Sequence, residues 1–266
     1  MIFLQAQGTN SNPNTVFDIL AIIGALAWLA PLFTWIRNKV TEPSIMIIPY
    51  KQLEIGYTIY GSIINIHLSF LAKDKNALIN KIKIKLHHEK NETNIFTWSW
   101  FEEEIYQVEN PELGSIPVKK NQRAIAINAL NSVLVEKKIG FQIPEFKNKY
   151  DTLYDKAKEV YTNLKSNWDE NKMQSSIEYN RVIDYFENSS IWKIGKYKAI
   201  IEVFILKRNT PFTHTIEFEL NSEDLKSIKK NIETCKSVAH NHFISPVPNK
   251  PIWEWIFAES KGTIID

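Results

Sequence analysis

The sequence predicts a mainly β fold with helices (α+β), in which an N-terminal transmembrane helix precedes an antiparallel immunoglobulin-like β-sandwich that carries an inserted helical hairpin. Three observations support this fold class. Residues 19–36 are all uncharged, in a chain that is 23% charged overall. After residue 44, many short segments alternate apolar and polar side chains, which is typical of half-buried strands. Between residues 146 and 190, apolar side chains recur every three or four positions, which indicates amphipathic helices.

The uncharged run lies within residues 16–37, which we interpret as the transmembrane helix. A span needs about 20 mostly apolar residues, and only Thr34 is polar between Ile19 and Ile36, so no face of this helix suits water. A core helix would show a polar face, and a signal peptide would begin with a basic region, which is absent from this tail. Aromatic and basic side chains at its end suit the membrane interface. The predicted anchor residues are Ile19, Trp28, Pro31, Trp35, Arg37 and Lys39.

The charges beside this run predict its orientation. Residues 1–15 form a short tail without Lys or Arg, whereas Arg37 and Lys39 follow the run. By the positive-inside rule, we therefore expect the tail to be translocated and the C-terminal domain to remain in the cytoplasm. The single cysteine, Cys235, agrees with a reducing compartment. We predict a single-pass protein of the cell inner membrane, with the lipid bilayer as one partner.

Small residues within the run suggest a helix–helix contact. Ala21 and Ala25 are four residues apart with Gly24 adjacent, a spacing that lets two membrane helices approach closely. Such pairs also occur by chance. Self-association through this helix is therefore one hypothesis, and a simple tether is the other.

Strand patterns fill residues 44–145, the first part of the predicted sandwich, and return in residues 191–266, its second part. Residues 63–72, 81–89 and 94–101 alternate apolar and polar side chains and are joined by short polar turns, which predicts an antiparallel meander. In the second part, residues 196–206 and 214–220 are expected to pair. An aromatic segment at residues 253–257 is expected to close the core as a last strand or docking segment, and a partner-binding or membrane-surface patch is the alternative.

One short motif in the second part resembles the tyrosine-corner entry of immunoglobulin-like domains. Gly195, Tyr197 and Ala199 have the G-x-Y-x-(small) spacing of that entry, over about a dozen residues. The acidic residue and the cysteine of antibody domains are replaced by Lys193 and Ala199. The resemblance implies a sandwich topology and no binding residues. An ordinary glycine turn before a strand is the alternative.

Helical periodicity interrupts the strands. Residues 146–168 form one amphipathic pattern and residues 175–189 a second, so residues 146–190 are expected to form a helical hairpin. A third helix is expected from Asn221 or Ser222, which would act as its cap.

The sequence contains no motif that names a reaction. His87 and His88 are adjacent on a predicted strand and point to opposite faces, whereas His240 and His242 would share a face of an extended segment but lack a third ligand nearby. The acidic run Glu102–Glu104 suits a solvated loop better than a cation site or a pair of catalytic carboxylates. We therefore infer no catalytic residue, no metal and no cofactor.

Basic side chains gather on one predicted strand, where Lys81, Lys83, Lys85 and His87 share a face. This stripe suits a solvated sheet face, but it would also bind a small acidic ligand or anionic lipid. The formal net charge is only +2, which gives no long-range field for duplex nucleic acid.

Together these features favour a non-enzymatic function: a membrane-anchored protein that presents a cytoplasmic β-sandwich as a binding or assembly module for a protein partner or for itself. A second hypothesis follows from the layout of a single anchor and a cytoplasmic sensing domain, which is similar to that of membrane effectors in bacterial antiphage defence. In that role the soluble domain senses a ligand or partner, and the helix assembles to disrupt the membrane. A membrane-tethered enzyme using Glu102–Glu104 or His240 and His242 is the third hypothesis.

Overall fold

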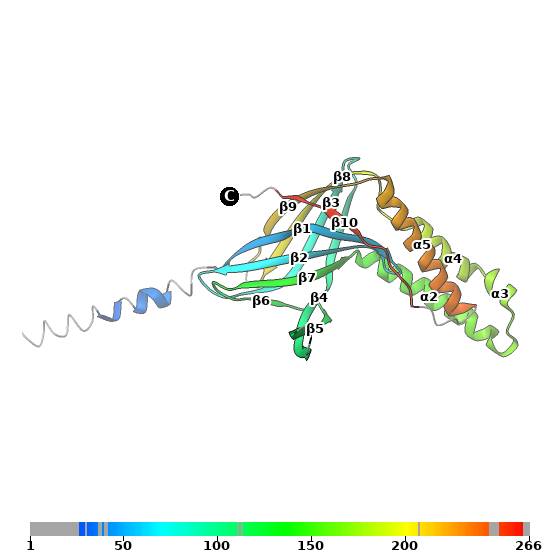
Figure 1. Cartoon of the computed structure of the whole chain (residues 1–266), viewed down its shortest axis with the longest axis horizontal. Helices are drawn as coiled ribbons and strands as arrows, with labels where there is room; N and C mark the ends of the chain where they lie inside the picture. The colour runs from blue at the N-terminus through cyan, green and yellow to red at the C-terminus, as the bar shows by residue number, and fades with distance from the viewer. Residues whose placement is uncertain are drawn as a thin grey trace, which may run out of the picture. The chain divides into compact units, whose positions relative to one another are not determined.

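The computed structural model describes residues 27–29, 31–36, 39, 42–110, 112, 114–206, 208–244 and 250–262. The chain divides into two compact units, Met1–Pro43 and Ser44–Asp266. Figure 1 shows the whole chain, and each unit is considered by itself.

The first unit does not contain the predicted membrane span among its described residues. These residues are helical at 27–29, 31–36 and 39, and in the part of the chain that the structure describes no helix is both long and apolar enough to cross a bilayer. A crossing needs about 20 residues of continuous apolar helix, which these short stretches do not provide. The predicted fold class included a transmembrane helix, and this prediction is wrong for the described residues. Ile19, Ala21, Gly24, Ala25 and Arg37 lie outside them.

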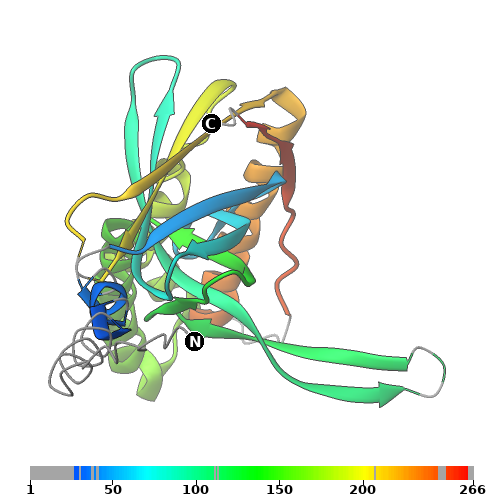
Figure 2. The ribbon, with the colours of Figure 1, turned by 90° about the vertical axis from the view of Figure 1, so that its left-hand side faces the viewer.

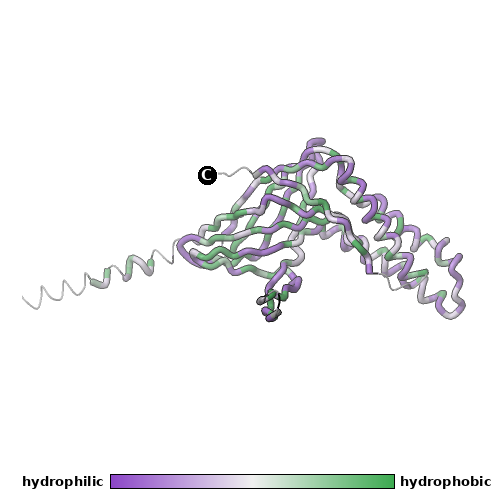
Figure 3. Tube along the Cα trace, in the orientation of Figure 1, coloured by the Kyte–Doolittle hydropathy of each residue, from purple (hydrophilic) through white to green (hydrophobic). Residues whose placement is uncertain are grey.

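The second unit is mainly antiparallel sheet with helices, and its described residues form one sheet of eleven strands. The strands are β1 (Ser44–Thr58), β2 (Gly61–Lys73), β3 (Ala77–His88), β4 (Thr93–Asn110), β5 (Gly114–Arg123), β6 (Ile127–Ala129), β7 (Leu134–Gln142), β8 (Gly195–Ile205), β9 (Phe212–Leu220), β10 (Ile256–Glu259) and β11 (Lys261–Gly262). Apolar and polar residues alternate along them, as the colours of Figure 3 show, because successive side chains point to opposite faces.

The strand order is β10-β1-β2-β7-β4-β3-β8-β9-β11, with β5 added to β4 and β6 to β3. Strand β10 pairs with β1 and β11 pairs with β9, and only Ser260 separates the two short strands. One segment of chain therefore joins both edges of the sheet. The sheet curls around its apolar side, so that strands face one another across a common core.

This topology corrects the predicted immunoglobulin-like sandwich, because a single continuous sheet replaces two packed sheets. It also corrects the predicted meander: β2 pairs with β1 and β7, whereas β3 pairs with β4, β6 and β8. The pairing of β8 with β9 and that of β3 with β4 are as predicted. Alternation identifies a strand but leaves its partner open, and strands adjacent in sequence pair in only about two-thirds of cases.

The helices are α2 (Pro144–Leu164), α3 (Glu170–Gln174), α4 (Ile177–Asn188) and α5 (Ser222–Phe243), with a 3-10 turn at Lys165–Asn167. The structure confirms both predicted helices of the hairpin and the third helix. At the start of α5, the side chain of Asn221 accepts from the backbone N–H groups of Glu223 and Asp224, as expected for a cap. In Figure 1 the helices gather at one end of the sheet.

Tyr57 on β1 joins the sheet to these helices. Its side chain is fully buried, and its hydroxyl donates to the carbonyl of Phe186 at 3.1 Å and lies 2.6 Å from Oγ of Ser189. Burial raises the pKa of this phenol, so the hydroxyl keeps its proton at neutral pH. The end of α4 is therefore fixed to β1 by a neutral, buried hydrogen bond.

We expect Tyr57→Phe to lower the free energy of unfolding by about 1–3 kcal/mol, because it leaves the buried carbonyl of Phe186 without its donor. Urea denaturation followed by circular dichroism measures this change. The matched control is Tyr50→Phe, since Tyr50 lies on the same strand but is 61% exposed and should lose almost nothing. Equal losses in the two variants would contradict the role of the buried hydroxyl.

Candidate functional site

The predicted site residues do not come together. Among the predicted anchor residues, Trp28, Pro31, Trp35 and Lys39 are helical and exposed, and the ammonium of Lys39 lies 4.3 Å from the ring centroid of Trp35. This contact stabilises a local helical turn through a cation–π interaction. It identifies no site.

The basic stripe lies on the outer side of β3, where its alternation with buried Ile82, Ile84 and Leu86 is as predicted. Lys85 forms a 2.5 Å ion pair with Glu202 on β8, and the ammonium of Lys81 lies 5.5 Å from the ring centroid of Phe204. Part of the positive charge is therefore neutralised within the sheet. Binding of an acidic ligand or lipid by the stripe stays a prediction.

The histidine pair on α5 also differs from the prediction. His240 and His242 lie on a helix that continues to Phe243, not on an extended segment. Oη of Tyr154 is 2.6 Å from Nε2 of His242, and Oη of Tyr179 is 3.5 Å from Nδ1 of His240. Each histidine therefore contacts a different neighbouring helix. Within the described residues no group of three or more His, Cys, Asp or Glu side chains could hold a metal ion.

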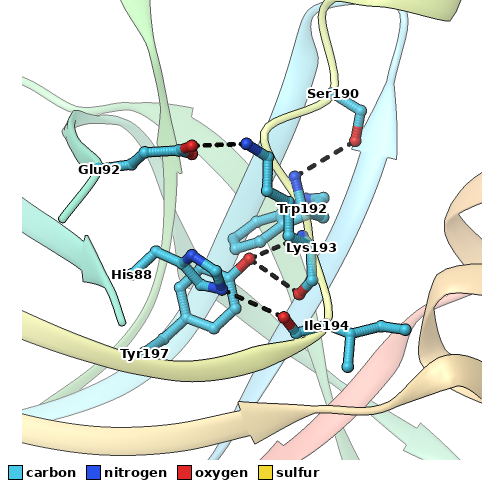
Figure 4. Close-up of polar contacts among 7 residues, drawn as sticks. All are labelled: His88, Glu92, Ser190, Trp192, Lys193, Ile194 and Tyr197. Atoms are coloured by element: carbon cyan, nitrogen blue, oxygen red, sulfur yellow. Dashed lines mark hydrogen bonds and ion pairs between the residues drawn. The ribbon is translucent and has the colours of Figure 1, made fainter. Parts of the chain in front are cut away.

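The entry to β8 is a well-fixed polar cluster (Figure 4). Oη of Tyr197 donates to the carbonyl of Lys193 at 3.0 Å and accepts from the N–H of Lys193 at 2.7 Å. Burial raises the pKa of the Tyr197 phenol, which therefore remains a donor. The side chain of Lys193 pairs with Glu92 at 2.6 Å, and this hydrogen bond lowers the pKa of that carboxyl group. The tyrosine hydroxyl thus hydrogen-bonds the backbone a few residues upstream, as in a tyrosine corner, although the sheet is not an immunoglobulin sandwich.

His88 packs beside this corner and is only 5% exposed. Its Nε2 lies 3.2 Å from the carbonyl of Ile194, and its ring centroid is 4.7 Å from that of Tyr197. Among the described residues, Nδ1 has no hydrogen-bond partner and is enclosed by protein. Through these two contacts the ring of His88 supports the turn at the start of β8.

A cavity of about 490 Å³ adjoins the cluster. Its charged lining alternates in sign across the strands, since Lys198 lies opposite Glu217 and Glu217 opposite Lys261. Cross-strand pairs of opposite charge stabilise a sheet surface. Four glutamates and three lysines line the cavity, and so this lining favours no single class of charged ligand.

A different feature is the better candidate site: a two-stranded arm formed by residues 102–110 of β4 and 114–121 of β5. Strand β7 pairs with β4 only as far as Phe101, and β5 pairs with β4 alone among the described strands. Figure 2 shows this hairpin extending away from the rest of the sheet. Within the described residues, no further strand pairs with the arm on either side.

One side of the arm is apolar, and we call it the arm face. Tyr106 is paired with Val118 and Val108 with Ile116, so these four side chains share one side. Tyr106 is 57% exposed, Val108 45% and Ile116 37%. On β5, Ile116 and Val118 have the same parity as Gln122, which pairs with the buried Phe101. The arm face is thus a continuation of the core side of the sheet, and no layer formed by the described residues covers it.

On the opposite side of the arm, polar side chains hydrogen-bond one another. Gln107 donates to Glu104 at 2.8 Å, and Ser115 donates to Gln107 at 2.8 Å. Nearer the sheet, Glu102 pairs with Lys119 at 3.4 Å on this polar side. Glu103 lies on the side of the arm face, where it pairs with Lys137 of β7 at 3.2 Å. The acidic run Glu102–Glu104 is therefore a paired strand segment, and neither the predicted solvated loop nor a cation site.

Sequence reasoning missed the arm. The signal was present, because apolar residues alternate at 106 and 108 and again at 116 and 118, on either side of the sequence Pro111-Glu112-Leu113-Gly114, whose proline and glycine are typical of turns. This pattern predicts a hairpin. It does not reveal whether the apolar side is covered by the rest of the fold.

No known protein family and no curated protein matches this chain. Among solved structures, the chain is similar to a family 123 glycoside hydrolase from Clostridium perfringens, with 11% identity and a TM-score of 0.30. The match covers 68% of this chain and 27% of the hydrolase chain. With so low a TM-score and identity, this similarity supports no conclusion about the fold or the activity of the chain.

The β8 entry leads to a prediction about Gly195, which has a φ of +130°. A Cβ there would lie 2.3 Å from Oε1 of Glu89, whose Oε2 accepts from the N–H of Lys196 at 3.2 Å. We expect Gly195→Ala to lower the free energy of unfolding by about 1–3 kcal/mol through backbone strain and displacement of that carboxylate. Thermal and urea denaturation measure the loss.

The control for this variant is Gly114→Ala. Gly114 has a φ of +73°, but an added Cβ would meet no described atom within 4 Å, so only the left-handed backbone should cost stability, about 1 kcal/mol. If Gly195→Ala costs no more than Gly114→Ala, the close fit at the β8 entry is not important for stability.

Proposed function

We propose that residues 44–262 act as a non-enzymatic assembly module that binds another protein through the arm face. The observation that carries this proposal is the uncovered apolar side of the arm. A two-stranded hairpin alone is marginally stable in water, and burial of exposed apolar surface contributes about 25 cal/mol per Å². A partner that covers Tyr106, Val108 and Ile116 would bury their apolar surface. This burial would stabilise the arm and contribute to the free energy of binding.

The geometry supports binding through the face of the arm and not through its β5 edge. Strand β5 contains Pro117, which has no backbone N–H, and Lys119 and Lys120 follow. Proline and lysine on an edge strand discourage the addition of a further strand. The side chains of the arm face remain as the apolar surface that a partner can contact.

Attachment to the inner membrane remains a prediction from the sequence. The same holds for the antiphage effector role, which depends on the helix-contact residues Ala21, Gly24 and Ala25 outside the described part of the chain. Neither role is needed for the arm to bind a protein.

A photo-crosslinking amino acid placed at position 108 tests the proposal in cells that produce the full chain. We expect a discrete protein adduct, because Val108 lies at the centre of the arm face. The matched control is the same group at position 107, because Gln107 is adjacent on β4 but points to the polar side. Equal labelling from both positions, or no protein adduct from position 108, would show that the arm face is not a binding surface.

A further inference from the structure

We infer that one end of the curled sheet docks on the surface of an anionic lipid bilayer. This is the end at which β1 begins, and we call it the entry end. It comprises the first residues of β1, residues 73–76 between β2 and β3, residues 130–133 before β7, and the loop at residues 206–211. In Figure 1 it lies opposite the helices. Such docking does not involve the arm and needs no helix that crosses the bilayer.

An apolar row crosses the outer side of three neighbouring strands at the entry end. Met46 on β1 is paired with Leu71 on β2, and Leu71 is paired with Leu134 on β7, so the three side chains share one side of the sheet. That side faces outward, because the alternating residues Ile45 and Phe70 are buried in the core. Met46 is 41% exposed and Leu134 is 48% exposed. The described residues therefore leave this row in contact with solvent.

Further apolar side chains extend this surface around the entry end. Leu130 and Val133 are exposed in the connection that leads into β7. On the other half of the sheet, Leu78 and Leu206 are exposed, and the N–H of Leu206 donates to the carbonyl of Leu78 at 2.9 Å. Exposed aliphatic groups that gather in one region in this way indicate a binding surface.

The same end of the sheet is basic. Residues 73–76 and 206–211 contain one acidic residue, Asp74, and four basic ones: Lys73, Lys75, Lys207 and Arg208. Their formal charge of +3 exceeds the +2 of the whole chain, so positive charge is concentrated here. Basic groups beside exposed apolar side chains can bind anionic headgroups while the apolar groups enter the upper acyl chains.

A bilayer fits this surface better than another protein does. Lysine is depleted in protein–protein interfaces, whereas at a bilayer its stem can lie along apolar surface while its ammonium group stays among the headgroups. Residues 27–36, which precede β1 in the chain, also present six large exposed apolar side chains and are followed by Lys39. These six are Trp28, Leu29, Leu32, Phe33, Trp35 and Ile36. Two surfaces of the same apolar and basic character are thus covalently connected by a few residues.

Glu136 limits how deeply the entry end can enter lipid. It lies two residues beyond Leu134 on β7 and is paired with Ser69, on the same outer side of the sheet. Two strand residues span about 6.6 Å, which agrees with the depth of about 5–10 Å at which interfacial apolar groups lie. Docking therefore places Leu134 at the level of the upper acyl chains and leaves the carboxylate of Glu136 among the headgroups, because a carboxylate is costly in hydrocarbon.

A dye at position 133 tests this docking in the full chain, because the single native cysteine, Cys235, is fully buried and should not react. The labelled Val133→Cys chain is mixed with vesicles of phosphatidylcholine and phosphatidylglycerol in equal amounts, where part of the phosphatidylcholine carries a nitroxide on its upper acyl chain. We expect roughly half of the fluorescence or more to be quenched, because a docked side chain lies about 5–10 Å deep.

The matched control is a dye on Lys90→Cys. Lys90 is exposed in the turn between β3 and β4, at the opposite end of the sheet, and its dye should be quenched little. Both variants carry the same N-terminal segment, so any attachment through that segment affects them equally. The difference between the two dyes therefore reports the contact of the entry end itself.

Charge reversal tests the class of lipid. With the dye at position 133, Lys73→Glu together with Lys75→Glu should lower the quenching roughly threefold or more, because the reversed charges are repelled by anionic headgroups. Lys90→Glu together with Lys229→Glu changes the net charge equally at exposed positions outside the entry end and should have little effect. Circular dichroism checks that each variant is folded.

Three results would overturn the docking. The first is equal quenching at positions 133 and 90, or no quenching at position 133. The second is an equal effect of the two charge-reversed pairs, which would exclude anionic lipid as the ligand. The third is a dye at position 133 that responds to protein concentration without vesicles and is not quenched with them, which would make the entry end a contact between copies of the chain. Each result leaves the proposed function of the arm face unchanged.

Discussion

The hydrogen bond from the indole N–H of Trp192 to the carbonyl of Gly56 connects the parts of the second unit that lie far apart in sequence. It is 2.9 Å long and buried, and the ring of Trp192 stacks on Phe96 with centroids 6.1 Å apart. Gly56 belongs to β1, Phe96 to β4, and Trp192 lies on the segment that leads from α4 into β8. The position of β8 beside β3 therefore depends on a side chain held by two other strands.

Neighbouring contacts reinforce this connection. Ser189 is held by Tyr57, the N–H of Ile191 donates to Oγ of Ser62 at 3.3 Å, and Lys193 is held by Tyr197. Each contact fixes one successive part of the segment between helix and sheet. Because β8 also pairs with β9, and β9 with β11, these contacts help to position the segment that joins the two edges of the sheet.

Local patterns in the sequence predicted the elements better than their arrangement. The periodicity around Tyr150 and Ala157, and the cap at Asn221, identified helices that the structure contains, because these signals depend on neighbouring residues. The curled sheet was not predictable in this way. Its order places β7 and β4 between β2 and β3, and this choice depends on contacts between residues far apart in the chain.

The motif at Tyr197 also predicts local structure but not the arrangement of the strands. Its hydroxyl bonds the backbone of Lys193, so the short spacing of Gly195 and Tyr197 does indicate the local geometry. The topology inferred from it was nevertheless wrong. A corner of this kind needs only a turn, a strand and a buried tyrosine, and several sheet architectures provide these.

The arm follows from the way in which the sheet is closed. Strand β4 extends beyond the residues that pair with its neighbours in the main sheet. Strand β7 pairs with it only as far as Phe101, and β3 pairs with it only between Thr93 and Thr97. Beyond that point only β5 accompanies it, so the core side of β4 continues into solvent. If this extension only connected two strands, polar side chains on both sides would make it more soluble. The apolar residues at Tyr106, Val108 and Ile116 are therefore better explained by a contact that the isolated chain does not make.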